Sequence, residues 1–103
     1  MQSEELERIV QDWEQGDFIS IIHHQTTSGL KRVSGMYQHY ERDGGRYGPY
    51  VRYFPETTYN RGLQQIRGMG KPIMVRVEKI DHIKRIETKE QVLQRFMELC
   101  GQA

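Results

Sequence analysis

The spacing of apolar residues changes within the segment from residue 71 to 87. Positions 73–77 alternate between aliphatic and other side chains, which is the period of a strand with one apolar face. Isoleucines then follow at every third position from Ile80 to Ile86. This change predicts a strand, a corner at Asp81-His82 and a second short strand. A last strand bent in this way can pair with the first strand of a small barrel and cover its exposed edge.

Helices are predicted at both ends of the chain. Residues 1–16 carry an apolar stripe from Leu6 to Trp13, with Ser3 as N-cap and Gly16 as the C-terminal stop. Residues 88–100 carry a second stripe and begin with the capping-box spacing of Thr88 and Gln91. We expect one core formed by the following residues of the first helix and the bent strand pair: Leu6, Ile9, Trp13, Ile73, Val75, Val77, Ile80, Ile83 and Ile86.

Three further strands are predicted between the helices. They cover Phe18–His24, Leu30–Glu41 and Tyr50–Phe54, and Gly35 indicates a bulge or bend within the second of them. A turn at residues 43–45 separates the last two. The prolines on either side of the third strand favour an edge position. The glycine-rich segment 56–70 is too long for a simple connection, so it is either functional or poorly ordered.

These elements predict a single domain that is mainly β with flanking helices, of the α+β class. A chain of 103 residues is long enough for one modest core. The first choice of architecture is a small five-stranded SH3-like or Sm-like antiparallel barrel at residues 18–87, with the helices 1–16 and 88–100 beside it. A single sheet packed by two helices is the alternative.

The order of these segments resembles the YolD-like group of Sm-like small barrels. The resemblance covers residues 4–87 and rests on a helix followed by FISIIHH, a long strand ending in HYE, then YVRYF and VEKIDHIKRIE. It implies a small bacterial or phage-borne protein that is associated with DNA-damage responses and is not an enzyme. The wider Sm-like resemblance implies nucleic-acid contact or oligomerisation. The segment 56–70 and the helix at 89–100 depart from the pattern, so no specific partner is carried over.

Charge is unevenly distributed along the chain, although the formal net charge is only +1. Residues 1–19 hold six acidic side chains and one basic one, whereas residues 20–85 hold twelve basic and five acidic ones. A basic module therefore follows an acidic helix, which favours an anionic partner or internal charge balance. The single cysteine, Cys100, and an N-terminus without an apolar run indicate a cytoplasmic protein with neither signal peptide nor membrane anchor.

No catalytic or metal-binding motif is recognised. The four histidines lack the spacing of a metal site, and Cys100 lies on an apolar helix face without a predicted base beside it. Neither a phosphate-binding loop nor a nucleophile elbow is found. We therefore expect a protein without cofactor, metal or enzymatic activity.

The most informative functional feature is a mixture of arginine and tyrosine between residues 42 and 67. In Tyr50–Phe54 the first, third and fifth side chains share one face of the strand. Arginine beside tyrosine suits phosphate pairing and base stacking, and it is also common at protein interfaces. The predicted binding residues are Arg46, Tyr47, Tyr50, Arg52, Tyr53, Tyr59, Arg61 and Arg67.

These observations predict a non-enzymatic binding module, of bacterial or phage type, that acts on a protein partner as adaptor, regulator or inhibitor. The alternative is a nucleic-acid-binding Sm-like barrel that uses the same arginine and tyrosine residues. A homodimer through strand or helix pairing is also expected, since the apolar content is low and the third strand has features of an edge.

Overall fold

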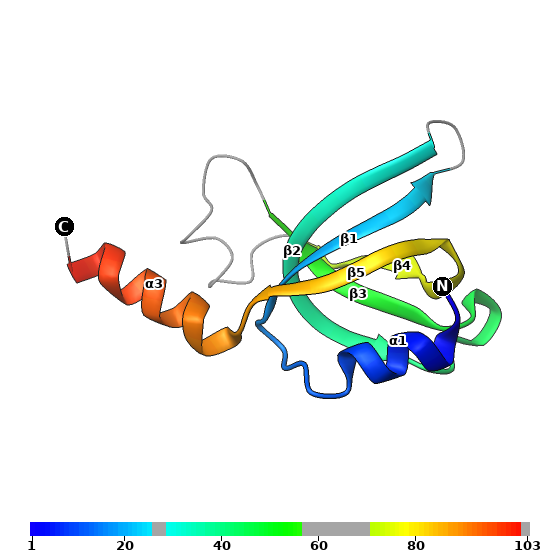
Figure 1. Ribbon diagram of the computed structural model, residues 1–103, viewed down its shortest axis with the longest axis horizontal. Coiled ribbons are helices and arrows are strands. Elements are labelled where there is room, and N and C mark those ends of the chain that lie inside the picture. The colour runs from blue at the N-terminus through cyan, green and yellow to red at the C-terminus, as the bar shows by residue number, and fades with distance from the viewer. Residues whose placement is uncertain (26–28, 57–70, 102–103) are drawn as a thin grey trace.

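The computed structural model describes residues 1–25, 29–56 and 71–101, without the side chains of residues 96, 99 and 100 (Figure 1). The described elements, in chain order, are α1 (Ser3–Val10), β1 (Phe18–Gln25), β2 (Gly29–Glu41), η1 (Gly45–Tyr47), β3 (Tyr50–Pro55), β4 (Ile73–Arg76), η2 (Val77–Lys79), β5 (Ile80–Glu87) and α3 (Lys89–Gly101), where η denotes a short 3-10 helix. The chain is therefore mainly β with two helices in its described part, as the α+β prediction requires.

The five strands form one antiparallel sheet in the order β4-β3-β2-β1-β5. The outermost strands would lie roughly 19 Å apart in a flat sheet of this order. Only η2 joins them, and three residues of 3-10 helix span about 6 Å. The sheet must therefore curl, and Figure 1 shows β5 crossing in front of β3 and β4. The predicted pairing of the last strand with the first is confirmed, but β4 and β5 do not pair, so the sheet is not a closed barrel.

The corner between β4 and β5 lies at η2, and its predicted position at Asp81-His82 is wrong. Val77 and Ile80 are both buried because residues three apart share one side of a 3-10 turn. Asp81 and His82 are exposed residues of β5. Asp81 has no partner in β1, because the register passes from the Ile22–His82 pair to the His23–Ile80 pair. This bulge allows Ile80 and Ile83 to face the same core.

The core lies on the concave, inner face of the curled sheet and is covered at one end by α1. It consists of the following buried residues: Leu6, Val10, Ile19, Ile21, Tyr37, Val51, Tyr53, Val75, Val77, Ile80 and Ile83. Ile9 and Trp13 pack against it half-buried. Two predicted core residues are not part of it, since Ile73 is 43% and Ile86 47% exposed. Ile73 is the first residue of β4, and Ile86 is the unpaired residue at a second irregularity between β1 and β5.

Helix α1 is shorter than the predicted helix 1–16 and ends at Val10. Ser3 is its first residue and not its N-cap, and the Ser3 hydroxyl lies 2.6 Å from the Tyr40 hydroxyl. Trp13 lies after the helix, outside any regular element, and its ring meets that of Tyr37 edge-on at 5.4 Å between centroids. Gly16 is therefore not a helix stop. It lies in the turn before β1 with φ of 105°, a conformation that favours glycine.

The long strand β2 changes partner near its middle. Its first part pairs with β1 and its last part with β3, and both pairings overlap at Gly35 and Met36. The predicted irregularity at Gly35 lies three residues later, because Gln38 has no partner between Tyr37 and His39. Gly35 allows close packing instead: a Cβ there would lie 2.0 Å from the Phe54 carbonyl oxygen.

Strand β3 is an interior strand, between β2 and β4, and its predicted edge position is wrong. Pro49 precedes the strand and Pro55 is its last residue. Prolines at the ends of a strand remove no donor from the middle of the ladder, so they mark its limits without excluding neighbours on both sides.

Helix α3 begins with the predicted capping box. The backbone N–H of Thr88 donates to Gln91 Oε1 at 2.7 Å, and the Gln91 N–H donates to Thr88 Oγ1 at 3.2 Å. Buried Asp17 connects this end to the sheet by accepting from the Lys89 N–H at 2.7 Å and pairing with Arg85 at 3.3 Å. Beyond this anchor the helix projects away from the sheet (Figure 1).

Candidate functional site

The side chains of β3 alternate between the two faces of the sheet. Val51 and Tyr53 point into the core, with 0% and 2% exposure, while Tyr50, Arg52 and Phe54 are half-buried on the outer face. This division was predicted from the strand period. Tyr53 itself is not available for binding as predicted, because it is a core residue. Burial raises the pKa of its hydroxyl above the usual value.

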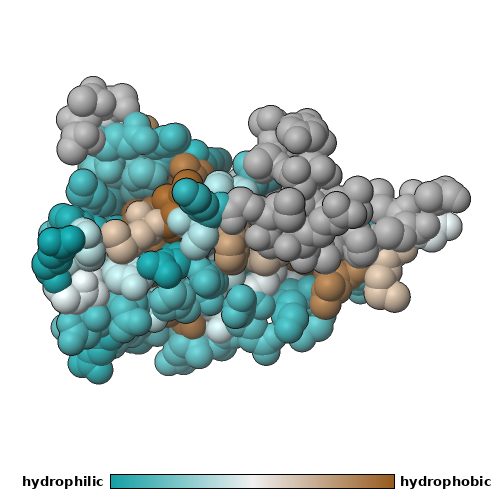
Figure 2. All heavy atoms as spheres, turned by 180° about the vertical axis from the view of Figure 1, so that it is seen from behind, coloured by the Kyte–Doolittle hydropathy of each residue, from teal (hydrophilic) through white to brown (hydrophobic). Residues whose placement is uncertain are grey.

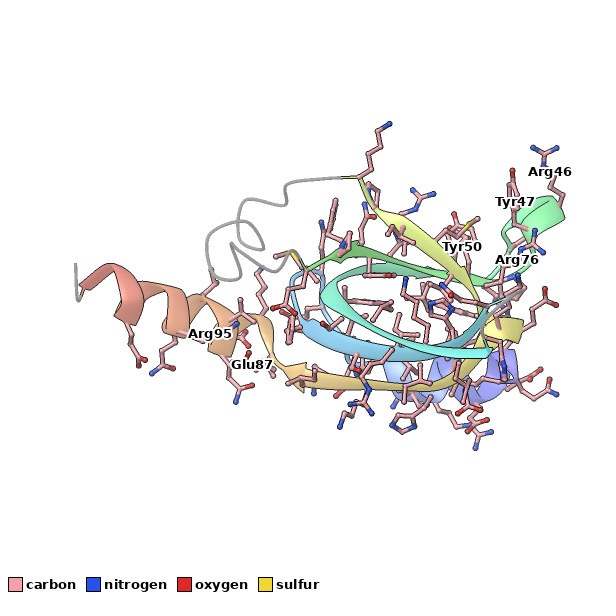
Figure 3. All side chains as sticks on the ribbon, turned by 90° about the horizontal axis from the view of Figure 1, so that it is seen from above. Arg46, Tyr47, Tyr50, Arg76, Glu87 and Arg95 are labelled. Carbon is pink, nitrogen blue, oxygen red and sulfur yellow. The ribbon has the colours of Figure 1, made fainter. Side chains whose placement is uncertain are left out.

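Tyr47 contacts two arginines at one end of this outer face. The Arg46 guanidinium carbon lies 5.0 Å from the centroid of the Tyr47 ring, and that of Arg76 lies 5.7 Å away. Arg46 also donates to the Tyr47 hydroxyl at 3.0 Å. Arg76 comes from β4 and Tyr47 from η1, so the arrangement joins segments distant in the sequence (Figure 3). The ring remains 40% exposed and can receive a partner.

A second arginine–tyrosine pair lies beside it on β3. The Arg52 guanidinium carbon is 5.5 Å from the centroid of the Tyr50 ring, and the His39 ring meets Tyr50 at 6.0 Å. Pairing of β3 with β4 brings Tyr50 opposite Arg76, because strand register aligns these two positions. We call Arg46, Tyr47, Tyr50, Arg52 and Arg76 the Arg/Tyr surface.

The Arg/Tyr surface borders a hollow of about 580 Å³. Glu41, Asp43 and Met74 line it together with three residues of the surface, Tyr47, Tyr50 and Arg52. Asp43 also accepts a hydrogen bond from the Gly45 N–H at 3.3 Å, which fixes the turn that carries Tyr47. The hollow therefore contains carboxylates, a guanidinium, aromatic rings and a thioether, and it has no single sign of charge.

The other predicted binding residues, Tyr59, Arg61 and Arg67, lie outside the described residues. Sequence reasoning missed Arg76, Met74 and His39, which the strand register brings to the same face. The alternation at residues 73–77 already places Met74 and Arg76 opposite the apolar side chains. Their proximity to Tyr47 and Tyr50 depends on the pairing of β4 with β3, which that alternation does not specify.

In the part of the chain that the structure describes, no three histidine, cysteine or acidic side chains gather where a metal ion could bind. His23 pairs with Lys31 across β1 and β2, whereas His39 lies opposite Arg52. The side chain of Cys100 lies outside the description, so its surroundings are not assigned.

No protein-family model, curated protein or solved structure matches the chain. The resemblance to the YolD-like group stays a prediction. Among the described helices, neither has the length and apolar character needed to cross a membrane.

Proposed function

We propose that this chain is a non-enzymatic binding module that acts on a protein partner, as adaptor, regulator or inhibitor, through the Arg/Tyr surface. The observation that carries the proposal is the partly exposed Tyr47 ring, which has the guanidinium groups of Arg46 and Arg76 over it and lines a hollow. Arginine and tyrosine are enriched among the residues that dominate binding energy at protein interfaces. A ring already held by two neighbours loses little conformational entropy on binding.

The charge of the hollow favours a protein over a nucleic acid. Glu41 and Asp43 line it beside Arg52, so a phosphate backbone placed there would meet two carboxylates. A folded protein can present cations to these carboxylates and an acidic group to Arg52, with an apolar side chain against Met74. The mixed lining therefore supports the protein-partner proposal over the nucleic-acid alternative.

We further propose that the curled sheet is a partly open barrel of the SH3-like or Sm-like type. The strand order, the 3-10 turn between β4 and β5 and the helix before β1 support this assignment. Such a scaffold holds η1 and the outer face of β3 rigidly, which is the arrangement that a preformed binding surface needs. Formation of a homodimer stays a proposal of its own, and sedimentation at several concentrations tests it.

The function is tested by placing a photo-crosslinking amino acid at position 47 and identifying the captured protein. The dissociation constant of the complex with the captured protein is then measured for the purified wild-type chain and for the double variant Tyr47→Ala/Arg52→Ala. We expect a loss of affinity of about a hundredfold, as is typical when two interface hot spots are truncated. The control is His82→Ala/Lys84→Ala, two exposed residues of β5, which should bind like the wild type.

Equal binding by the Tyr47→Ala/Arg52→Ala variant would show that the surface lies elsewhere. A titration with single- and double-stranded oligonucleotides over a range of salt concentrations tests the alternative function. If oligonucleotides bind, with log affinity falling linearly with log salt, and Tyr47→Ala/Arg52→Ala abolishes that binding, the nucleic-acid function replaces the proposed one.

A further inference from the structure

A second groove lies at the open side of the curled sheet, between the outer edge of β4 and the hairpin of β1 and β2. It has a volume of about 580 Å³. All four residues of β4, from Ile73 to Arg76, line it. Since successive side chains of a strand point to opposite faces, four consecutive residues can line one groove only where it follows the strand's backbone edge. The groove therefore runs along this edge.

The edge of β4 offers backbone groups for pairing. In the described sheet, β4 is an outermost strand with β3 as its only neighbour. Every second residue of such a strand directs its N–H and C=O away from the sheet, where an added strand can bond to them. The four residues are about 13 Å long, which suits an extended segment of four or five residues.

The walls of the groove carry positive charge at its rim and apolar side chains at its floor. Val33 and Tyr53 continue the core surface into it. Farther along the inner face, the His23–Lys31 cross-strand pair follows the pair formed by buried Ile21 and half-buried Val33, and Lys79 of η2 also lines the groove. None of the described residues that line the groove carries a carboxylate. Figure 2, which views the molecule from behind, shows a narrow hydrophobic strip bordered by hydrophilic surface near this hairpin.

We propose that this groove binds an extended acidic segment of a partner protein, which adds to β4 as a further strand. The backbone edge explains why the segment is extended, and Lys31 and Lys79 explain why it is acidic. Aliphatic residues between the acidic ones contact the floor at Val33. Arg76 is already engaged by Glu78 at 3.6 Å and by Tyr47, so the two lysines are the principal cations for the ligand. The proposal goes beyond the Arg/Tyr surface and does not depend on it.

The probe is a dye-labelled peptide of about ten residues in which glutamate and valine alternate, measured by fluorescence anisotropy with the full chain. We expect it to bind, and the double variant Lys31→Glu/Lys79→Glu to bind about tenfold more weakly or less. The matched control Arg32→Glu/Lys84→Glu has the same net charge but changes exposed residues that do not line the groove, so it should retain most of the affinity. The variant Lys31→Gln/Lys79→Gln should show an intermediate loss of affinity for the peptide. It replaces the charge-reversed variant if the reversed charges impair folding.

Two further measurements separate strand addition from simple charge attraction and from other occupants. The same acidic peptide with methyl groups on alternate backbone nitrogens should not bind, because it lacks the donors that pair with β4. Tyr47→Ala/Arg52→Ala should bind the peptide normally, which separates this site from the proposed function.

The proposal is overturned if the acidic peptide binds no better than one with lysine in place of glutamate, or if the methylated peptide binds equally well. It is also overturned if a single-stranded oligonucleotide displaces the peptide completely, since the groove would then bind phosphates. A homodimer that the Lys31→Glu/Lys79→Glu variant abolishes would overturn it too, because the occupant would be a second copy of the chain.

Discussion

Strands β3 and β4 contribute one face to the core and the other face to the candidate binding site. On the inner face, Val51, Tyr53 and Val75 are at most 5% exposed and form the core. On the outer face, Tyr50 lies opposite Arg76 and Arg52 opposite Met74 in the strand register, and all four are half-buried. Adjacent residues of one strand therefore differ in whether substitution should change stability or binding.

This difference shows how a small chain with little apolar content combines a core with a binding surface. An apolar side chain at an inner position excludes water from the core, whereas an outer position is free to carry arginine or tyrosine. The division also limits where mutations are informative about function, because variants of inner residues alter the scaffold before they alter any partner contact. The predictions below test the division, from the largest expected effect to the smallest.

Substitution of Val75 by aspartate should unfold the domain. Burial of an unpaired carboxylate costs several kcal/mol, a large part of the total stability of about 5–15 kcal/mol of a typical domain. Circular dichroism and urea titration measure the loss. Met74→Asp, one residue earlier on the half-buried outer face, should remain folded. A Val75→Asp protein with an unchanged melting temperature would contradict the assignment of the inner face.

Asp17→Ala should lower the free energy of unfolding by about 3–5 kcal/mol, since it leaves the Arg85 guanidinium without its buried partner. It also removes the acceptor of the Lys89 and Glu14 N–H groups. Asp12→Ala is the control, because the Asp12 side chain is 70% exposed and its ion pair with Arg85 spans 3.6 Å. That variant should change stability by less than about 1 kcal/mol. Equal effects of both variants in urea titrations would argue against Asp17 as the anchor of α3.

The inner tyrosines should make stability fall at high pH. Burial raises the pKa of Tyr37 to about 12, so between about pH 10 and 12 the folded state keeps a proton that the unfolded state has lost. The unfolded state is then favoured increasingly as the pH rises, by on the order of 2 kcal/mol. Urea titrations of wild type and Tyr37→Phe across this range measure the effect, which should be smaller in the variant. If the free energy of unfolding fell equally with pH in both proteins, the pKa of Tyr37 would not be raised in the folded state.

Removal of both arginines beside Tyr47, in Arg46→Ala/Arg76→Ala, should change stability least, by about 1 kcal/mol or less. Partner affinity should nevertheless fall, because the ring loses the two contacts that orient it. Thermal unfolding and binding to the purified partner are compared on the same preparations. A large loss of stability would show that this corner of the outer face supports the fold, contrary to the proposed division.

Local sequence patterns were sufficient to predict the existence and type of the described α-helices and strands, but not the two 3-10 helices. The alternation at residues 73–77, the apolar stripe of α1 and the capping box at Thr88 depend on side chains close in the chain. The division of β3 into inner and outer side chains followed for the same reason. Patterns with a spacing of three residues were ambiguous, because a helix, a 3-10 turn and a bulge can all bring such residues to one side.

The structure resolves that ambiguity differently in each place. A 3-10 turn brings Val77 and Ile80 to the same side. A bulge at Asp81 does so for Ile80 and Ile83. A bulge at Gln38 does so for Tyr37 and Tyr40. Ile86 continues the same spacing, yet it is itself the unpaired residue and is exposed. The pairing with the neighbouring strand decides which of these residues face the core. A local sequence pattern does not specify that pairing.

The candidate site shows the same limit. The sequence alone determined that arginine and tyrosine gather around β3, because they are neighbours in the chain, and that Tyr50 and Arg52 share a face, because strand geometry requires it. Only the tertiary structure decided that Arg76 stacks on Tyr47 and that Tyr53 belongs to the core. Within the described residues, the strand order also decides that β4 is an outermost strand, and Lys31 lines the groove that follows it. These features depend on which strands become neighbours, and that is set by burial of the whole inner face and not by any one segment.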